Sequence, residues 1–207
     1  MRTLFIDTST SDVSIAIIVE GKLVSSKCKS IPNAHSIYTV KFIDEVIKNA
    51  GLSPKDIDSI LVVTGPGSFT GVRIGVTIAK TYAYLRKIKI VEVSSLKMMA
   101  LSCVHEYCLS LIDAHHNNYY LGLYDKDNNE IIEEQFNTKE MVLGLINKYK
   151  PVVVSSEDIN IDNIEIKKCL LDIEGIVLYY QDKPAANAHL VVPNYLKLPQ
   201  ALEEKND

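Results

Sequence analysis

An internal repeat restricts the fold of this chain more than any other feature of its sequence. The segment Phe5-Ile6-Asp7 recurs as Leu111-Ile112-Asp113, 106 residues further along the chain. The same spacing relates the turn at Gly21 to the turn at Asp127, and it places Thr138 directly before a second helix. Each copy predicts an apolar strand that ends in aspartate, then a hairpin and a helix. We therefore expect two α/β halves built on the same plan.

The repeat divides the chain near its middle. We assign residues 1–106 to an N-terminal lobe and residues 107–207 to a shorter, degenerate C-terminal lobe with a frayed tail from Ala201 onward. In the first half the expected strands are residues 3–7, 13–19, 23–28, 59–64 and 88–93, and the expected helices are residues 34–50, 70–87 and 94–105. In the second half the expected strands are residues 111–113, 152–154 and 176–180, and the expected helices are residues 139–149 and 159–170.

The composition argues against several classes of protein. The 207 residues include 22 basic and 26 acidic side chains, for a net charge of −4, which does not suit binding of nucleic acid by bulk charge alone. No stretch approaches the roughly 20 apolar residues of a membrane-spanning helix, and the first residues do not resemble a signal or transit segment. The spacings of the four cysteines fit neither a zinc site nor a disulfide framework. We expect a reduced cytoplasmic protein without bound metal.

A glycine-rich loop between a predicted strand and a predicted helix is the most informative short motif. It runs from Gly65 to Gly75, and at such a position backbone amides and the helix dipole can hold an anion such as phosphate. The loop is not a P-loop, because Thr70 stands where that motif requires glycine and no Gly-Lys-Ser/Thr sequence occurs. The alternative interpretation is a tight turn whose helix is capped by Ser68 or Thr70. The residues alone leave both interpretations open.

The two long helices predicted in the first half are apolar over more of their circumference than a sheet can cover. A helix needs an apolar stripe of only about 100° to pack on a sheet. The excess indicates a second buried face, either internal packing or a protein interface, and we favour the interface. Gly71, Gly75, Ala79 and Ala83 recur every four positions and indicate close backbone packing. The candidate interface residues are His35, Ile37, Tyr38, Lys41, Phe42, Glu45, Arg73, Thr77, Ile78 and Tyr82.

Taken together, these motifs resemble the TsaB (YeaZ) family. The matching segments are Ile6-Asp7-Thr8-Ser9, Ala34-His35-Ser36, the loop from Gly65 to Gly75, Ser94-Ser95-Leu96, Ile112-Asp113-Ala114 and Pro193-Asn194-Tyr195-Leu196. The loop is the most specific of these, and the resemblance extends over essentially the whole chain. It implies a duplicated actin-like α/β fold (ASKHA, ribonuclease-H-like), with two lobes of mixed sheets flanked by helices.

The resemblance also implies a function without catalysis. Proteins of this family are the non-catalytic partner subunit of the bacterial machinery that makes threonylcarbamoyladenosine in tRNA. The resemblance implies a heterodimer with a catalytic TsaD-like paralogue, contact with a TsaE-like ATPase through the complex, and a homodimer when the chain is alone. It further implies that contact with tRNA is indirect, that no membrane is involved and that no cofactor is needed.

Residues that the catalytic paralogue uses are replaced in this chain. The resemblance places Ser95 and Met99 where TsaD has two metal-binding histidines, and neither residue suits a divalent ion as a ligand. The glycines Gly122, Gly144 and Gly175 are isolated, so the second loop that seats adenosine in actin-like enzymes is missing. What remains is a possible degenerate phosphate loop. Its residues are Asp7, Thr8, Ser9, Gly65, Gly67, Ser68 and Gly71.

Two other functions remain as alternatives. The first is an ATP-binding phosphotransferase or ATPase of the actin-like class, which would use Asp7, Thr8 and the glycine-rich loop. The second is a peptidase, which we disfavour because no nucleophile–base pair is recognisable and His105-Glu106 lacks the second histidine of a zinc protease motif. His115 and His116 are expected on a strand, where they point to opposite faces and do not share one metal ion.

Overall fold

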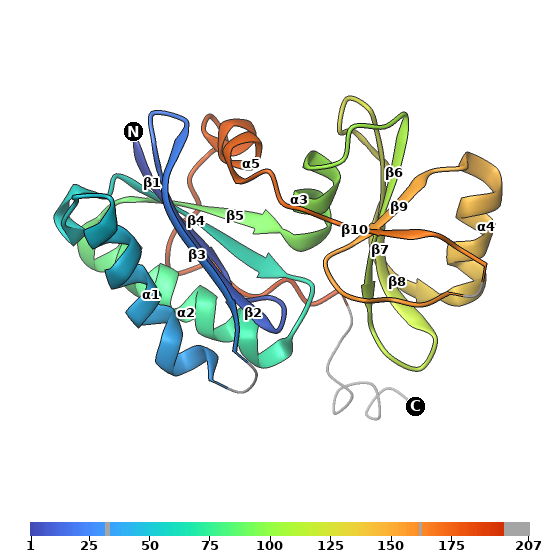
Figure 1. Cartoon of the computed structure of the whole chain (residues 1–207), viewed down its shortest axis with the longest axis horizontal. Coiled ribbons are helices and arrows are strands. Elements are labelled where there is room, and N and C mark those ends of the chain that lie inside the picture. The colour runs from blue at the N-terminus through green and yellow to red at the C-terminus, as the bar shows by residue number, and fades with distance from the viewer. Residues whose placement is uncertain (32–33, 162, 197–207) are drawn as a thin grey trace.

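Two five-stranded mixed sheets form the frame of the molecule and stand beside each other in Figure 1. This computed structural model describes residues 1–31, 34–161 and 163–196. The strands of the first sheet are β1 (Arg2–Asp7), β2 (Asp12–Val19), β3 (Lys22–Ser30), β4 (Ser59–Gly65) and β5 (Lys89–Ser94). Those of the second sheet are β6 (Tyr107–Asp113), β7 (Asn118–Asp125), β8 (Glu130–Thr138), β9 (Val152–Ser155) and β10 (Ile166–Lys168). The helices are α1 (His35–Asn49), α2 (Phe69–Arg86), α3 (Ser95–Leu101), α4 (Lys139–Tyr149) and α5 (Ile173–Tyr180), with a 3-10 turn at Pro54–Asp56.

Both sheets have the same strand order, as the internal repeat predicts. The first sheet runs β3-β2-β1-β4-β5, and the second runs β8-β7-β6-β9-β10. In each sheet the first strand of the lobe pairs antiparallel with the second strand and parallel with the strand that follows the long helix. Strand β7 keeps the 106-residue spacing from β2 at both of its ends. The predicted duplicated actin-like α/β fold is confirmed by this arrangement.

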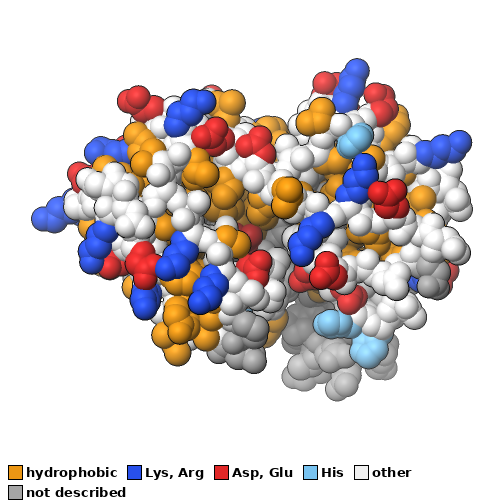
Figure 2. All heavy atoms as spheres, viewed as in Figure 1, with side chains coloured by type: hydrophobic (Ala, Val, Ile, Leu, Met, Phe, Trp, Pro, Cys, Tyr) orange, Lys and Arg blue, Asp and Glu red, His pale blue; other side chains and the backbone are white. Residues whose placement is uncertain are grey.

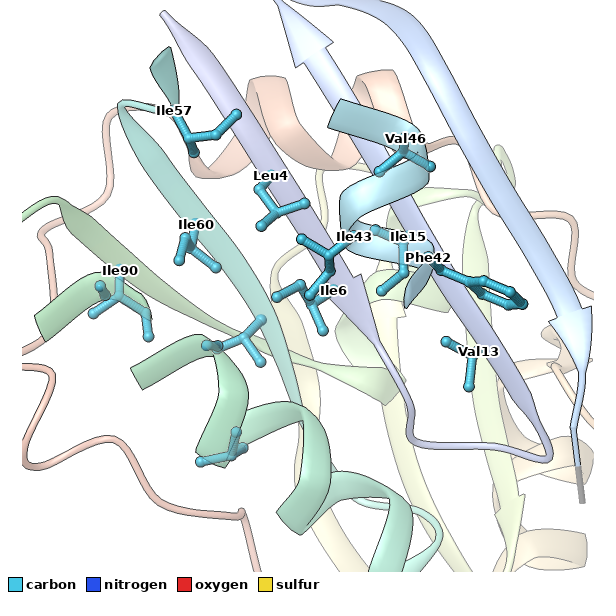
Figure 3. Close-up of a cluster of buried hydrophobic side chains, with 14 of the residues drawn as sticks. Leu4, Ile6, Val13, Ile15, Phe42, Ile43, Val46, Ile57, Ile60 and Ile90 are labelled. Carbon is cyan, nitrogen blue, oxygen red and sulfur yellow. The ribbon is translucent and has the colours of Figure 1, made fainter. Parts of the chain in front are cut away.

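Helices cover both faces of the first sheet, so its inner strands β1, β2 and β4 bury successive residues. Leu4 and Ile6 of β1 face α1 and α2, as Figure 3 shows, whereas Phe5 faces α3 and α5. Helix α3 lies between the sheets, and α5 packs beside it on the first sheet. Met98 of α3 and Ile176 of α5 contact the same cluster as Phe5. Helix α3 also packs on the second sheet, and α4 covers the outer face of that sheet. Within the described residues, none of the helices has the length and apolar character needed to span a bilayer.

The last part of the second half differs from the sequence prediction. Residues 176–180 are predicted as a strand, yet they belong to α5, whose first turn is held by the Asp172 carboxylate accepting from the amide of Gly175. Burial of this helix against the first sheet overrides the strand preference of its β-branched and aromatic residues. Residues 159–170 are predicted as a helix, yet β10 lies within them because Ile166 pairs with β9 and packs on the second core. Both predictions are wrong.

Two shorter expectations in the middle of the chain also need correction. The helix predicted to reach residue 105 ends at Leu101. His115 and His116 lie in the turn between β6 and β7 instead of on a strand, with φ angles of 64° and 54°. Asn117 has a φ of 60°, so three successive residues adopt the left-handed conformation that closes this turn.

After α5, which already packs on the first sheet, the chain continues along the first lobe. The amide of Ala186 donates to the carbonyl oxygen of Ile90 at 2.8 Å, so the chain meets the first sheet at the edge strand β5. Further along, the amide of Asn194 donates to the carbonyl oxygen of Thr64 at 2.7 Å. We name residues 184–196 the return segment.

The return segment is part of the core of the first lobe. Val191 is fully buried in the cluster beneath α1 and α2. The boundary that we propose at residue 106 therefore separates the two sheets along the sequence, while α5 and the return segment contact the first sheet. The tail expected to fray from Ala201 onward lies outside the described residues.

Candidate functional site

The glycine-rich loop packs tightly against the turn that follows β1. A Cβ atom at Gly67 would overlap the carbonyl oxygen of Ser9, and one at Gly71 would overlap the carbonyl oxygen of Thr8. At Gly75 a Cβ atom would overlap the Thr8 hydroxyl. These glycines are therefore required because two backbone segments approach each other closely, which confirms the packing predicted from the small-residue spacing.

Hydrogen bonds within the chain occupy much of the loop. The Thr8 hydroxyl donates to the carbonyl oxygen of Gly71, and the Ser68 amide donates to the carbonyl oxygen of Ser9, both at 2.7 Å. The Gly71 amide donates to the hydroxyl oxygen of Ser68 at 3.2 Å, so Ser68 caps α2. The structure thus shows the tight, capped turn that we considered as the alternative to an anion site. An anion that binds at the loop would have to displace these bonds. Phosphate binding at this loop stays a prediction.

The two aspartates that the repeat aligns have similar local roles. One oxygen of the buried Asp7 carboxylate accepts from the amide and the hydroxyl of Ser9, at 2.8 and 2.7 Å. Asp113 accepts from the amide of His115 at 2.8 Å. Burial raises the pKa of Asp7, and the hydrogen bonds from Ser9 oppose this effect. Asp7 therefore holds the turn after β1 instead of facing an open site.

The cleft between the lobes is acidic. It has a volume of about 470 Å³, and its lining residues are Thr10, Ser11, Asp12, Ser30, Ser156, Glu157, Asp158 and Lys168. Burial and the nearby charge of Asp113 raise the pKa of Glu157. Three carboxylates against one lysine repel the phosphates of a nucleotide more than they attract them.

The positions that correspond to the paralogue's metal-binding histidines lie inside the protein. Ser95 and Met99 are 3% and 0% exposed, and Met99 packs between α3 and the second sheet. In the part of the chain that the structure describes, no three His, Cys, Asp or Glu side chains are arranged to hold a metal ion. Here Met99 serves the packing of α3 between the sheets.

An apolar groove runs between α1 and α2 on the outer face of the first lobe. It consists of two adjoining hollows of about 470 and 460 Å³, which share Val40, Thr77 and Ile78. Val40 and Leu85 line the groove and are 56% and 71% exposed, and Ile37, one turn before Val40, is 70% exposed. Figure 2 shows apolar side chains gathered at the lower left, over these helices. We name this surface the α1–α2 groove.

The residues predicted for an interface fall into three groups. Ile37, Lys41, Arg73 and Thr77 are exposed, Tyr38, Glu45, Ile78 and Tyr82 are half-buried, and His35 and Phe42 are buried. Phe42 packs in the core of the first lobe, and His35 Nε2 lies 2.9 Å from the carbonyl oxygen of Thr10. Because neither side chain is open to a partner, we exclude both from the proposed interface.

The predicted set also omitted three side chains that line the groove. Val40, Phe69 and Leu85 are each about half exposed or more. The signal for them was the apolar excess of the two helices. Helical periodicity does not tell which of two apolar faces packs on the sheet. For this reason the predicted interface includes Phe42 of α1 and omits Val40.

A family model and curated relatives both match this chain, and they share one subject, the threonylcarbamoyladenosine modification of tRNA. The family model described as "TsaD: tRNA N6-adenosine threonylcarbamoyltransferase" matches residues 29–172. The "tRNA threonylcarbamoyladenosine biosynthesis protein TsaB" of Bacillus subtilis (strain 168) is 30% identical over 222 residues, which covers 97% of this chain and 96% of that protein. The protein of the same name from Escherichia coli (strain K12) is 33% identical over 135 residues, which covers 63% of this chain and 58% of that protein.

Solved structures show the same fold. A Pseudomonas aeruginosa protein described as similar to the peptidase YeaZ superposes with a TM-score of 0.79 at 23% identity, covering 95% of this chain and 99% of that chain. YeaZ from Pseudomonas aeruginosa superposes with a TM-score of 0.74 at 21% identity, covering 94% and 99%. At these identities the likeness concerns the fold of the whole chain.

Proposed function

The chain belongs to the TsaB (YeaZ) family of tRNA threonylcarbamoyladenosine biosynthesis proteins, and on this premise we propose that it is a non-catalytic subunit required for threonylcarbamoyl transfer to adenosine of tRNA. It docks on a catalytic TsaD-like paralogue as a heterodimer and reaches a TsaE-like ATPase through that complex. Alone, the chain forms a homodimer, and its contact with tRNA is indirect. The observation that carries this proposal is the α1–α2 groove.

The groove has the properties of a docking surface. Val40 and Leu85 expose more than half of their surface in the free chain, so a partner that covers them removes apolar area from water. The groove lies between two helices, a form that accepts an apolar ridge or helix of a partner. A few such apolar contacts at the centre of an interface supply most of its binding free energy.

Two observations support a role without catalysis, against the alternative of an ATP-binding phosphotransferase. The glycine-rich loop is occupied by the turn at Thr8 and Ser9, and the cleft between the lobes is acidic. We therefore expect weak nucleotide binding by the isolated chain when ATP with magnesium is titrated by calorimetry. A micromolar dissociation constant, about −8 kcal/mol, would instead favour the phosphotransferase.

Val40→Glu tests the docking surface. We expect this substitution to weaken association with the catalytic paralogue by about a hundredfold or more, because docking would bury a charge without a partner. The thermal melt of the isolated chain should change little, because Val40 is 56% exposed. Size-exclusion chromatography of the mixed proteins and calorimetry measure the association. Ile78 and Tyr38 are less suitable sites, because both pack against the core of the first lobe.

Leu170→Glu is the matched control. This leucine is 85% exposed and lies between β10 and α5, outside the groove, so the same charge there should leave association unchanged. If both Val40→Glu and Leu85→Glu bind the paralogue as tightly as the unmodified chain, the docking surface lies elsewhere. Light scattering of the same variants without the paralogue tests the homodimer, which the proposal also places at this surface.

A further inference from the structure

Helix α2 lines the groove and carries only positive charge. Its 18 residues include no aspartate or glutamate, although the whole chain has a net charge of −4. Two of its three basic residues are bonded to backbone carbonyl oxygens. Lys80 donates to carbonyl oxygens of the return segment, and Arg86 donates to the carbonyl oxygen of Lys55. The third, Arg73, lines the groove itself.

The guanidinium of Arg73 is held in one position by two aromatic side chains. Its Cζ lies over the Phe69 ring, 3.5 Å from the ring centroid, and the side chain is exposed. Its Nε donates to the hydroxyl of Tyr195 in the return segment at 2.8 Å. Within the described residues, no carboxylate forms an ion pair with Arg73. The remaining N–H groups of this side chain are therefore available to an acceptor from outside the chain.

The carboxylates of α1 are not available as that acceptor. Asp44 pairs with Lys48 at 2.7 Å, and Glu45 pairs with Lys27. The surface between the helices therefore combines an apolar floor with a fixed, unpaired cation.

We propose that Arg73 receives a carboxylate of the partner protein that fills the α1–α2 groove, an inference that rests on the proposed function. A planar guanidinium that is already oriented loses little conformational freedom when it binds a carboxylate through two parallel hydrogen bonds. The partner surface that fits is thus an apolar ridge bordered by an aspartate or glutamate. Arg73 supplies the register of docking, and the apolar contacts supply most of the affinity.

The chemistry of the groove favours a protein carboxylate over a nucleic-acid phosphate. Phosphate backbones are bound by several lysines and arginines spaced along a groove, whereas Arg73 is the one basic side chain among the described residues that line this groove. A second copy of the chain is a poorer match, because its own α1 carboxylates are already paired. The catalytic paralogue therefore remains the occupant that the proposal names.

Calorimetry of the full chain with the catalytic paralogue, at about 0.05 M and about 0.5 M salt, tests the proposal. We expect Arg73→Gln to weaken association about tenfold and Arg73→Glu about a hundredfold, and the salt dependence should be shallower for Arg73→Gln than for the unmodified chain. Tyr195→Phe keeps the ring but removes the acceptor for Nε, and should weaken association about threefold. Arg86→Glu, on the same helix but outside the groove lining, is the matched control and should stay within about twofold. Thermal melts show that each variant is folded at the temperature of the binding measurement.

The outcomes separate this proposal from the docking proposal beneath it. If Val40→Glu prevents docking while Arg73→Glu keeps the affinity and salt dependence of the unmodified chain, the carboxylate contact is overturned and the docking surface stands. If none of these substitutions affects docking, the proposed function itself fails. If Arg73→Glu leaves docking intact but weakens binding of tRNA by the assembled complex, the anion is a phosphate and the proposal is wrong. An unchanged affinity of Tyr195→Phe would refute the positioning role of that hydroxyl.

Discussion

Gly71→Ala is expected to lower the free energy of unfolding by about 3 kcal/mol or more, because the added methyl group overlaps the carbonyl oxygen of Thr8. That oxygen belongs to backbone between β1 and β2, and it cannot move without disturbing both strands. The Thr8 hydroxyl also donates to the carbonyl oxygen of Gly71, so separation of the two segments breaks a buried hydrogen bond. Urea unfolding followed by circular dichroism measures the loss.

Gly144→Ala provides the control for the same chemical change in a helix. Nothing lies within 4 Å of a Cβ atom at this position of α4. Alanine is the better helix former, so this variant should be more stable by about 0.5–1 kcal/mol. If Gly71→Ala gives a similar gain, the close packing of the loop on the Thr8–Ser9 turn does not exist in solution, and an open phosphate loop becomes the better interpretation.

Lys97→Met is expected to destabilise the contact between the two lobes by about 3 kcal/mol at neutral pH, through the loss of a charged hydrogen bond and of a cation–π contact. Lys97 lies on α3 and is buried, and its ammonium group donates to the carbonyl oxygen of Asn128 and lies 4.6 Å from the centre of the Tyr124 ring. Glu134 accepts from the Tyr124 hydroxyl at 2.7 Å, and Lys97 favours its ionised form. The substitution leaves the carbonyl oxygen of Asn128 without its donor and removes the contact with the Tyr124 ring. It also takes away a nearby positive charge that favours the ionised form of the mostly buried Glu134.

The pH dependence of this effect measures the part of it that comes from Glu134. Burial raises the pKa of Glu134, so in the folded chain this carboxyl takes up a proton at a higher pH than in the unfolded chain. The cost of Lys97→Met is therefore complete above the folded-state pKa and decreases as the pH falls through it. Unfolding measured at neutral pH and at successively lower pH should show this decrease. The double variant Lys97→Met with Glu134→Gln should be more stable than Lys97→Met alone at neutral pH, and an equal or lower stability would contradict the assignment.

Local sequence determined the parts of the fold whose signal lies within one element. The repeat of apolar strand, aspartate and turn set the first hairpin of each sheet, because both aspartates bond to an amide two residues further on. Helical periodicity and small residues set α1, α2 and α4, and Ser68 set the start of α2. These features depend on neighbours along the chain, so they were predictable without knowledge of the other lobe.

The tertiary structure decided the features that depend on distant segments. Residues 176–180 become helical because α5 packs against the first sheet and α3, and no local pattern reveals these distant partners. The glycine-rich loop is closed by Thr8 and Ser9, which only the pairing of β1 with β4 brings near it. Periodicity showed that α1 has apolar side chains on two faces, but the position of the first sheet decided that Phe42 faces the core and Val40 the groove. The orientation of Arg73 likewise depends on a distant residue, Tyr195, which lies 122 residues later in the chain. Burial and pairing between such distant residues are properties of the folded chain as a whole.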